Sequence, residues 1–212
     1  MYLALTTRPD IVFVVSVLLC FGVNLGSAHW NTIKRVFKYL KGTTELWLTY
    51  GVFKGGDKLC GYTDADGNMV EDCHAVSGYA FMIDGGAVSW SLKKQDIILL
   101  SMTESKYVAT THSVKEALWM KNFISQLFNS LTEPVDIFCD NQSAITLAQD
   151  YQYHVHMKHI YICYHYIQWA IEHGDIQLIF CPTVDMAADI LTKALPSPKV
   201  KHFGSFLGLR TA

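Results

Sequence analysis

The sequence lacks an apolar stretch that is long enough to cross a membrane. Its longest largely apolar run, from Ile11 to Phe21, covers 11 residues, whereas a membrane-spanning helix needs about 20. The first residues also lack the basic stretch that opens a secretory signal peptide. We therefore expect an intracellular protein, in the cytoplasm or the nucleus, without a membrane partner.

Paired cysteines are missing as well. The six cysteines are far apart, form no C-x-x-C pair and mostly lie in apolar segments, so we expect reduced core thiols rather than disulfides. Four histidines lie close together, but no cysteine pair accompanies them and their spacing fits no common zinc site. A zinc site is therefore the less favoured interpretation of His154, His156, His159 and His165.

Residues 51–212 lack an excess of basic side chains. They hold 12 Lys and Arg against 17 Asp and Glu, while residues 1–50 hold five against two. Phosphate neutralisation by basic side chains supplies most of the non-specific affinity for nucleic acid. If the acidic part acts on nucleic acid, metal ions or a partner domain must compensate for its charge.

The composition is otherwise that of a globular protein. Half of the 212 residues are apolar or aromatic and 17% are charged, which is enough to bury a core. Within residues 1–50 we expect two helices, one beginning after Arg8-Pro9-Asp10 and one over His29–Leu40. The second carries four basic residues that form a solvated face or contact a nucleic-acid backbone: Lys34, Arg35, Lys38 and Lys41.

From Leu59 onward the pattern changes to short strands. Three antiparallel strands are expected, the last two joined by the turn sequence Asp84-Gly85-Gly86. A long helix follows, because apolar residues recur on one stripe over about Thr103–Asn129. The other expected elements are strands at Leu59–Thr63, Ser77–Ile83, Ala87–Ser91, Val135–Cys139 and Ile176–Cys181, and helices at Gln142–Gln149, Lys158–His173 and Val184–Leu195.

This order of elements, βββαβααβα, predicts an α/β fold. Three meander strands followed by alternating helices and strands give a mixed five-stranded sheet flanked by helices, with a small helical N-terminal appendage. We divide the chain into a helical part at 1–50, a linker at 51–58, a sheet domain at 59–198 and a C-terminal tail at 199–212.

Four acidic residues lie where the expected elements could converge. Asp64 follows Cys60 and Tyr62 on one face of the first sheet strand. Asp140 ends an apolar strand, at the carboxyl edge where open α/β sheets place their sites. On the long helix an acid lies on the core-facing stripe, where it needs compensation, and a further acid belongs to the last helix. These two are Glu104 and Asp189.

Each of these acids also has a purely structural interpretation. Glu104 could simply favour the dipole of its helix, and Asp140 could cap the helix that follows it. The spacing alone leaves other acids open as well. These are Asp66 and Asp72 in place of Asp64, and Asp185, four residues before Asp189, in its place.

Together the four acids would form a site for divalent metal ions. Carboxylates that converge without matching cations repel one another, unless a divalent ion binds between them. Oxygen ligands of this kind select Mg²⁺ or Mn²⁺. Two such ions about 4 Å apart can activate water and stabilise the leaving oxygen in a phosphodiester displacement. The residue types therefore indicate a two-ion site.

Eight sequence motifs follow one another along the chain. They are GYTDADG (61–67), VSGYAF (76–81), AVSWSLKKQ (87–95), LSMTESKYVA (100–109), EALWMKNFI (116–124), CDNQSAITLA (139–148), MKHIYICYHYI (157–167) and CPTVDMAADILTKALP (181–196). In order and spacing they resemble the ribonuclease H domain of copia-type retrotransposon Pol polyproteins. Upstream, TTRPDI and HWNTIKRVFKYLKGT are similar to the tail of the preceding reverse transcriptase, so the resemblance covers nearly the whole chain.

The resemblance implies a ribonuclease H-like fold for the sheet domain and a connection-like tail of a truncated reverse transcriptase for residues 1–50. It implies hydrolysis of the RNA strand of an RNA/DNA hybrid with two Mg²⁺ or Mn²⁺ ions. The implied partners are the hybrid, bound through its minor groove and 2′-hydroxyls, and the missing reverse transcriptase domain. Because the sheet domain is acidic, we expect weak hybrid binding by the chain alone. The family's four acids carry over onto Asp64, Glu104, Asp140 and Asp189.

Several positions depart from the family's pattern. The segments 67–70 and 74–76 differ from the usual residues, and Ile179 stands where many ribonucleases H have a histidine that helps product release. These departures favour an alternative in which the chain is a catalytically inactive element fragment that at most binds nucleic acid. A related carboxylate nuclease, such as an integrase or transposase, is disfavoured by the KALP and YLKGT segments.

Overall fold

The computed structural model describes residues 1–51, 58–67, 75–96, 101–128, 133–149 and 161–211. Its helices are α1 (Tyr2–Thr6), α2 (Val12–Cys20), α3 (Ser27–Lys41), α4 (Met102–Phe128), α5 (Gln142–Gln149), α6 (Tyr161–Glu172), α7 (Asp189–Thr192) and α8 (Ser197–Phe206), with 3-10 turns η1 (Pro9–Ile11) and η3 (Thr183–Asp185). Its strands are β1 (Leu46–Leu48), β2 (Cys60–Asp66), β3 (Val76–Ile83), β4 (Gly86–Lys94), β5 (Val135–Cys139), β6 (Ile176–Phe180) and β7 (Leu209–Thr211).

Five strands form one mixed sheet in the order β4-β3-β2-β5-β6. The first three make an antiparallel meander, and β2 pairs in parallel with β5, which pairs in parallel with β6. The turn between β3 and β4 runs through Asp84 and Gly85, which both have positive φ angles, as the Asp-Gly turn sequence predicted. This topology confirms the expected α/β fold of the ribonuclease H-like type.

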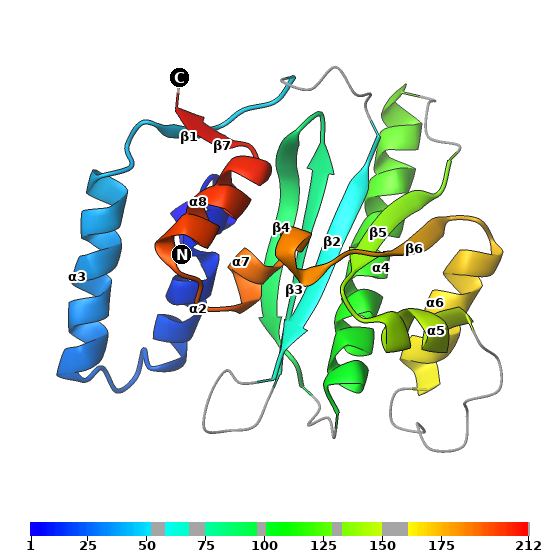
Figure 1. The fold of residues 1–212 in the computed structure, drawn as a ribbon, viewed down its shortest axis with the longest axis horizontal. Coiled ribbons are helices and arrows are strands. Elements are labelled where there is room, and N and C mark those ends of the chain that lie inside the picture. Colours follow the sequence, from blue (N-terminus) through cyan, green and yellow to red (C-terminus); the bar gives the residue numbers. More distant parts are fainter. Residues whose placement is uncertain (52–57, 68–74, 97–100, 129–132, 150–160, 212) are drawn as a thin grey trace.

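Helices cover both faces of this sheet (Figure 1). On one face α4, α5 and α6 pack against side chains that include Phe81 and Ile137. On the other face α7 and α8 pack against Tyr62 and Met82, together with Ile11 and neighbouring residues of the first helices. The helical N-terminal part therefore shares an apolar layer with the sheet. Each large apolar side chain that is fully buried there contributes about 1.5–3 kcal/mol to the stability of the fold.

A second, two-stranded sheet joins the segment after α3 to the C-terminal segment. Strand β1 pairs antiparallel with β7, with Leu46 opposite Thr211 and Leu48 opposite Leu209. Figure 1 shows this ladder above α8 and beside the loop that leads away from α3. The proposed boundaries at residues 50, 58 and 198 stay predictions. Within the described ranges, none of the helices combines the length and apolar character that a membrane span requires.

The expected helix over Val184–Leu195 is wrong in its extent. The chain forms η3, then a non-helical segment in which Met186 has an extended backbone, and only then α7. Met186, Ala187 and Ala188 are all completely buried. Every residue from Met186 to Thr192 is buried, so the sequence shows no stripe of helical period that would mark where α7 begins.

The other sheet-domain elements agree with expectation to within a few residues, except where they enter undescribed segments. The hairpin strand after residue 86 runs three residues further than expected, and α6 is described from Tyr161. The alternative acid Asp72 and three of the four clustered histidines lie outside the described residues. The described cysteines are free thiols, and Cys139 and Cys181 are buried as expected of core thiols. Cys60 and Cys163 are only partly buried, and Cys20 is exposed.

Gly78 allows α7 to approach the sheet closely. It lies in β3 opposite Asp64 of β2, and a Cβ atom there would lie 2.5 Å from Thr192 Cγ2 and 3.3 Å from Leu191 Cβ. Both of these neighbours belong to α7. A side chain at position 78 would therefore push α7 away from β2 and β3.

We predict that Gly78→Ala lowers the free energy of unfolding by about 1–3 kcal/mol, because an overpacked contact must be relieved by backbone movement. Urea denaturation followed by circular dichroism measures this. Gly42→Ala is the matched control, since a Cβ there would meet its nearest atom at 3.5 Å and should change stability by less than about 0.5 kcal/mol. Equal stability of the two variants would contradict the prediction.

Candidate active site

Strand pairing brings Asp64 and Asp140 together. In the parallel ladder between β2 and β5, Thr63 lies opposite Cys139, so Asp64 and Asp140 follow at the same level. Asp64 faces the side of the sheet that carries α7, in line with Tyr62. The apolar strands leave no choice of register, because a slip of one residue would turn their core side chains outward.

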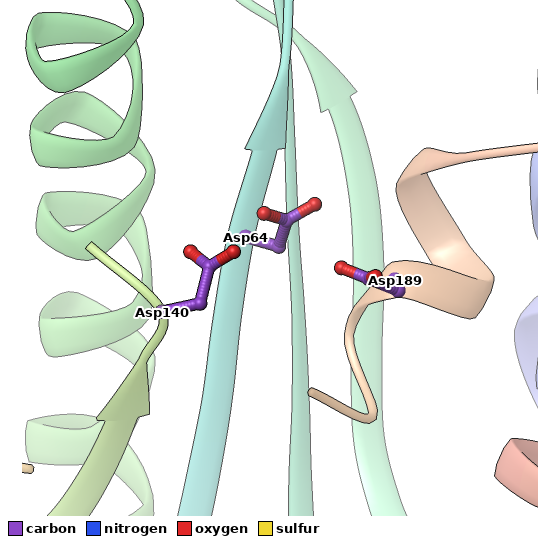
Figure 2. Close-up of side chains that lie close together, drawn as sticks. All are labelled: Asp64, Asp140 and Asp189. Carbon is purple, nitrogen blue, oxygen red and sulfur yellow. The ribbon is translucent and has the colours of Figure 1, made fainter. Parts of the chain in front are cut away.

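Asp189 joins these two acids from α7. One carboxylate oxygen from each of Asp64, Asp140 and Asp189 lies within 4.8 Å of the other two, and Figure 2 shows the three side chains pointing toward one another. Asp64 and Asp189 are 1% and 2% exposed. We call Asp64, Asp140 and Asp189 the acid cluster.

The positions of the side chains decide which acid of the last segment belongs to the site and which residue caps α5. Asp185 lies in η3 and is exposed, whereas Asp189 is buried in the acid cluster. The cap of α5 is Asn141, whose Oδ1 accepts a hydrogen bond from the Ala144 backbone N–H at 2.9 Å. Asp140 is therefore not required as a helix cap, and its carboxylate faces the other acids.

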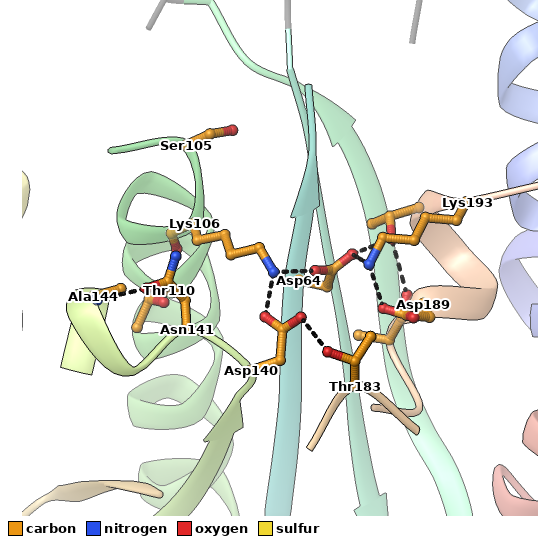
Figure 3. Close-up of polar contacts among 12 residues, drawn as sticks. Asp64, Ser105, Lys106, Thr110, Asp140, Asn141, Ala144, Thr183, Asp189 and Lys193 are labelled. Carbon is orange, nitrogen blue, oxygen red and sulfur yellow. Dashed lines mark hydrogen bonds and ion pairs between the residues drawn. The ribbon is translucent and has the colours of Figure 1, made fainter. Parts of the chain in front are cut away.

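Glu104 is not brought into the acid cluster. It lies in the first turn of α4, where its backbone N–H donates to Ser101 Oγ, so Ser101 caps this helix. The side chain of α4 that reaches the acids is Lys106 (Figure 3). Two residues correspond to roughly 200° around a helix, so Lys106 and Glu104 point in different directions. The assignment of Glu104 as a fourth ligand stays a prediction.

Two lysines form ion pairs with the acid cluster. Lys106 Nζ donates a short hydrogen bond to Asp140 Oδ1 and lies 3.3 Å from Asp64 Oδ1. Lys193 Nζ lies 3.1 Å from Asp64 Oδ2 and 2.7 Å from Asp189 Oδ1. Figure 3 shows these ammonium groups approaching from opposite sides. Three carboxylates thus face two ammonium groups.

Two threonines complete these contacts. Thr192 Oγ1 donates a short hydrogen bond to Asp64 Oδ2. Thr183 Oγ1 donates to Asp140 Oδ2 at 3.4 Å. The threonines contact the Oδ2 atoms of Asp64 and Asp140, whereas Lys106 approaches the Oδ1 atom of each.

Sequence reasoning missed these lysines and threonines. Lys193 had a visible signal, because it follows Asp189 by four residues and shares its helical face. Lys106 could have been found from a second stripe on α4, formed by the small buried side chains of Thr110, Ser113 and Ala117. That stripe is aligned with position 106 rather than with position 104.

The ionisation states follow from these contacts. Burial raises the pKa of the Asp189 carboxyl to about 6; the hydrogen bond from Lys193 opposes this shift and the Asp64 carboxylate adds to it. Burial opposes the charge of Lys106, but Asp64 and Asp140 outweigh it and raise its pKa. The pKa of Lys193 is raised by Asp64 and Asp189 in the same way, against the effect of burial. Both lysines are therefore cationic at neutral pH.

The acid cluster offers a donor set that suits a divalent cation. It consists of hard carboxylate oxygens, and Asp64 Oδ1 is buried without a hydrogen bond from any described residue. Lys106 approaches that oxygen at an ion-pair distance only. The residues therefore fit a divalent ion held by Asp64, Asp140 and Asp189, provided that the ammonium groups make room.

A separate pocket of about 600 Å³ lies away from this site. Its lining includes Tyr62, Phe138 and Phe206, with charged residues such as Lys58 and Arg210, and contains no member of the acid cluster. Two of its lining side chains, Tyr62 and Phe138, stack with their ring centroids 4.9 Å apart. The chemistry described above does not involve this pocket.

Comparisons with known proteins show which proteins this chain resembles. No protein family model matches it. The retrovirus-related Pol polyprotein of transposon TNT 1-94 from Nicotiana tabacum is 37% identical over 100% of this chain. The corresponding polyprotein of transposon RE2 from Arabidopsis thaliana is 34% identical over 98% of it. The solved structure of LC11-RNase H1, isolated from compost, is 17% identical and overlaps 64% of this chain and 93% of its own, with a TM-score of 0.48.

The polyproteins are much longer than this chain, which spans 16% of the first and 14% of the second. The alignments nevertheless run through the helical N-terminal part, the sheet and the acid cluster alike, because they include nearly every residue of the chain. On this evidence the chain belongs to the family of copia-type retrovirus-related Pol polyproteins.

Proposed function

We propose that this chain is the ribonuclease H-type part of such a polyprotein and hydrolyses the RNA strand of an RNA/DNA hybrid with Mg²⁺ or Mn²⁺. The observation that supports this proposal is the convergence of Asp64, Asp140 and Asp189, whose oxygens lie within 4.8 Å of one another. Acidic groups alone attract cations, not phosphodiesters. A metal-dependent reaction is therefore the chemistry that this site suits best.

In this proposal the residues of the chain hold and orient the reacting groups. Bound divalent ions would activate a water molecule and stabilise the leaving oxygen. Asp64, fixed at the centre of β2, and Asp140, at the end of β5, provide oxygens on a rigid sheet, so little reorganisation is needed. Asp189 provides the third ligand from α7, and Lys193 limits the excess negative charge.

The proposed substrate and partner follow from charge and family. A hybrid would be recognised by the shape of its minor groove and its 2′-hydroxyls, and the polymerase part of the polyprotein would supply basic contacts that the acidic sheet domain lacks. Lys34, Arg35 and Lys38 on α3 are available for such contacts, since α3 has no buried residue. Two metal ions and a role for Glu104 belong to this proposal as well.

A second candidate is a catalytically silent domain that at most binds nucleic acid. The observation that favours it is the position of Lys106 and Lys193, which already balance two of the three negative charges in the acid cluster. A site that is neutralised from within attracts divalent ions less strongly. The two candidates differ in whether the purified chain turns over.

We predict that the chain cleaves the RNA strand of a labelled RNA/DNA hybrid in the presence of Mn²⁺, and that Asp140→Asn slows cleavage by at least about a hundredfold, because a metal ligand is lost. Gel electrophoresis of the products measures the rate. Asp185→Asn is the matched control, since this nearby acid is exposed and outside the acid cluster. Unchanged cleavage by Asp140→Asn would exclude the proposed site, and a folded wild-type chain without cleavage would support the silent domain.

A pH-dependent effect on stability follows from the raised pKa of Asp189. A carboxyl whose pKa rises from 3.8 to about 6 on folding stabilises the fold below pH 4, and this contribution is lost as the pH rises through 6. Each pKa unit corresponds to about 1.4 kcal/mol, so the charged form costs on the order of 3 kcal/mol.

In metal-free buffer, Asp189→Asn should therefore be more stable than the wild type above pH 7, and the difference should shrink toward pH 4. The introduced amide oxygen can still accept the hydrogen bond from Lys193, so mainly the charge is removed. Unfolding by urea at a series of pH values measures the difference. A difference that is the same at pH 4 and pH 8 would contradict this assignment of the pKa.

A further inference from the structure

Lys106 takes the place in the acid cluster that a bridging cation would take. Its Nζ contacts Asp64 Oδ1 and Asp140 Oδ1 at once, so this one ammonium group bridges two carboxylates of the acid cluster. Only 11% of its side chain is exposed. The ammonium group is thus held inside the site and does not extend into solvent.

Lys193 has a different position from Lys106. It binds the other oxygen of Asp64 and one oxygen of Asp189, and 27% of its side chain is exposed. It directly follows α7, four residues after Asp189, so it accompanies that acid. A metal ion held by Asp64 and Asp140 could leave Lys193 in place. The same ion would have to displace the Lys106 ammonium group, which contacts both of these acids.

Because both are positively charged, the Lys106 ammonium group and a divalent ion cannot occupy the same place between Asp64 and Asp140. With both lysines present, the acid cluster has an excess of only one negative charge. A divalent ion added beside the Lys106 ammonium group would be repelled by it, because like charges at contact distance in a buried site are screened only weakly. The same carboxylate oxygens also cannot coordinate the metal and pair with the ammonium group.

We propose that Lys106 is a tethered cation that competes with divalent metal for Asp64 and Asp140, so that metal binds only when the Lys106 side chain leaves the acid cluster. This inference rests on the proposed metal site but not on catalysis. It makes Lys106 an autoinhibitory residue that sets the metal concentration at which the site fills. It also relates the two candidate functions, because a silent site and an active site would differ by the position of this one side chain.

The first test measures Mn²⁺ binding by electron paramagnetic resonance on the full chain. Lys106→Gln should bind Mn²⁺ roughly tenfold to a hundredfold more tightly than the wild type, since the competing charge is removed, while Lys106→Arg should keep the weak binding of the wild type. Lys121→Gln is the matched control. Lys121 lies on the same helix, its side chain is 12% exposed, and it forms an ion pair with Asp175 at 3.0 Å. Asp175 is not a member of the acid cluster.

The second test uses the wild-type chain, so it does not depend on whether a variant folds. Acetylation of lysine side chains followed by mass spectrometry reports how accessible each ammonium group is. Adding Mn²⁺ should increase the labelling of Lys106 at least about threefold, since its side chain is released, and leave Lys121 unchanged. Labelling of Lys106 that stays constant at saturating Mn²⁺ would overturn the proposal.

The outcomes separate this inference from the proposed nuclease. Equal Mn²⁺ affinity of the wild type and Lys106→Gln would reject competition by Lys106, even if the chain cleaves hybrids. Tighter binding by Lys106→Gln without cleavage by any variant would support competition and reject the nuclease. Absence of Mn²⁺ binding in the wild type and in Lys106→Gln would reject both.

Discussion

The Asp64 carboxylate is the group around which the rest of the site is arranged. A buried charge without partners costs several kcal/mol, and the side chain of Asp64 is completely buried. Its partners come from different elements: Lys106 from α4, Thr192 from α7 and Lys193 directly after α7. Compensation of this single charge therefore links both helical layers to the central strand, and Gly78 provides the space that α7 needs to take part.

The strands could be predicted from the sequence because their side chains alternate or form short apolar runs between turn residues. Val135–Cys139 is an example in which even the bounds agree. The segment after residue 183 could not, because Met186, Ala187 and Ala188 are buried by contacts with different elements, which no local periodicity reveals. The tail from 199 onward was given no element, yet it contains most of α8 and β7, because β7 depends on pairing with a strand far away in the sequence.

The site was partly predictable for a related reason. Asp64 and Asp140 end short buried strands, so their convergence follows from sheet topology. Lys106 is different: its inward direction depends on the phase of α4 against the sheet, and a shift of two residues on a helix changes the facing side almost completely. A stripe drawn through Tyr107 includes Glu104 as readily, and only the packed structure shows that Lys106 is the side chain that pairs with Asp64 and Asp140.

The ladder between β1 and β7 has a consequence for the order of folding. It joins positions as far apart as Thr49 and Gly208, which are 159 residues apart and hydrogen-bonded. The entropy lost on closing a loop grows with its length, and contacts between distant residues form slowly. The antiparallel meander of β2, β3 and β4 requires only short loops and can form early. Strands β1 and β7 are separated by nearly the whole sheet domain, so we expect their pairing to be a late step on the folding pathway.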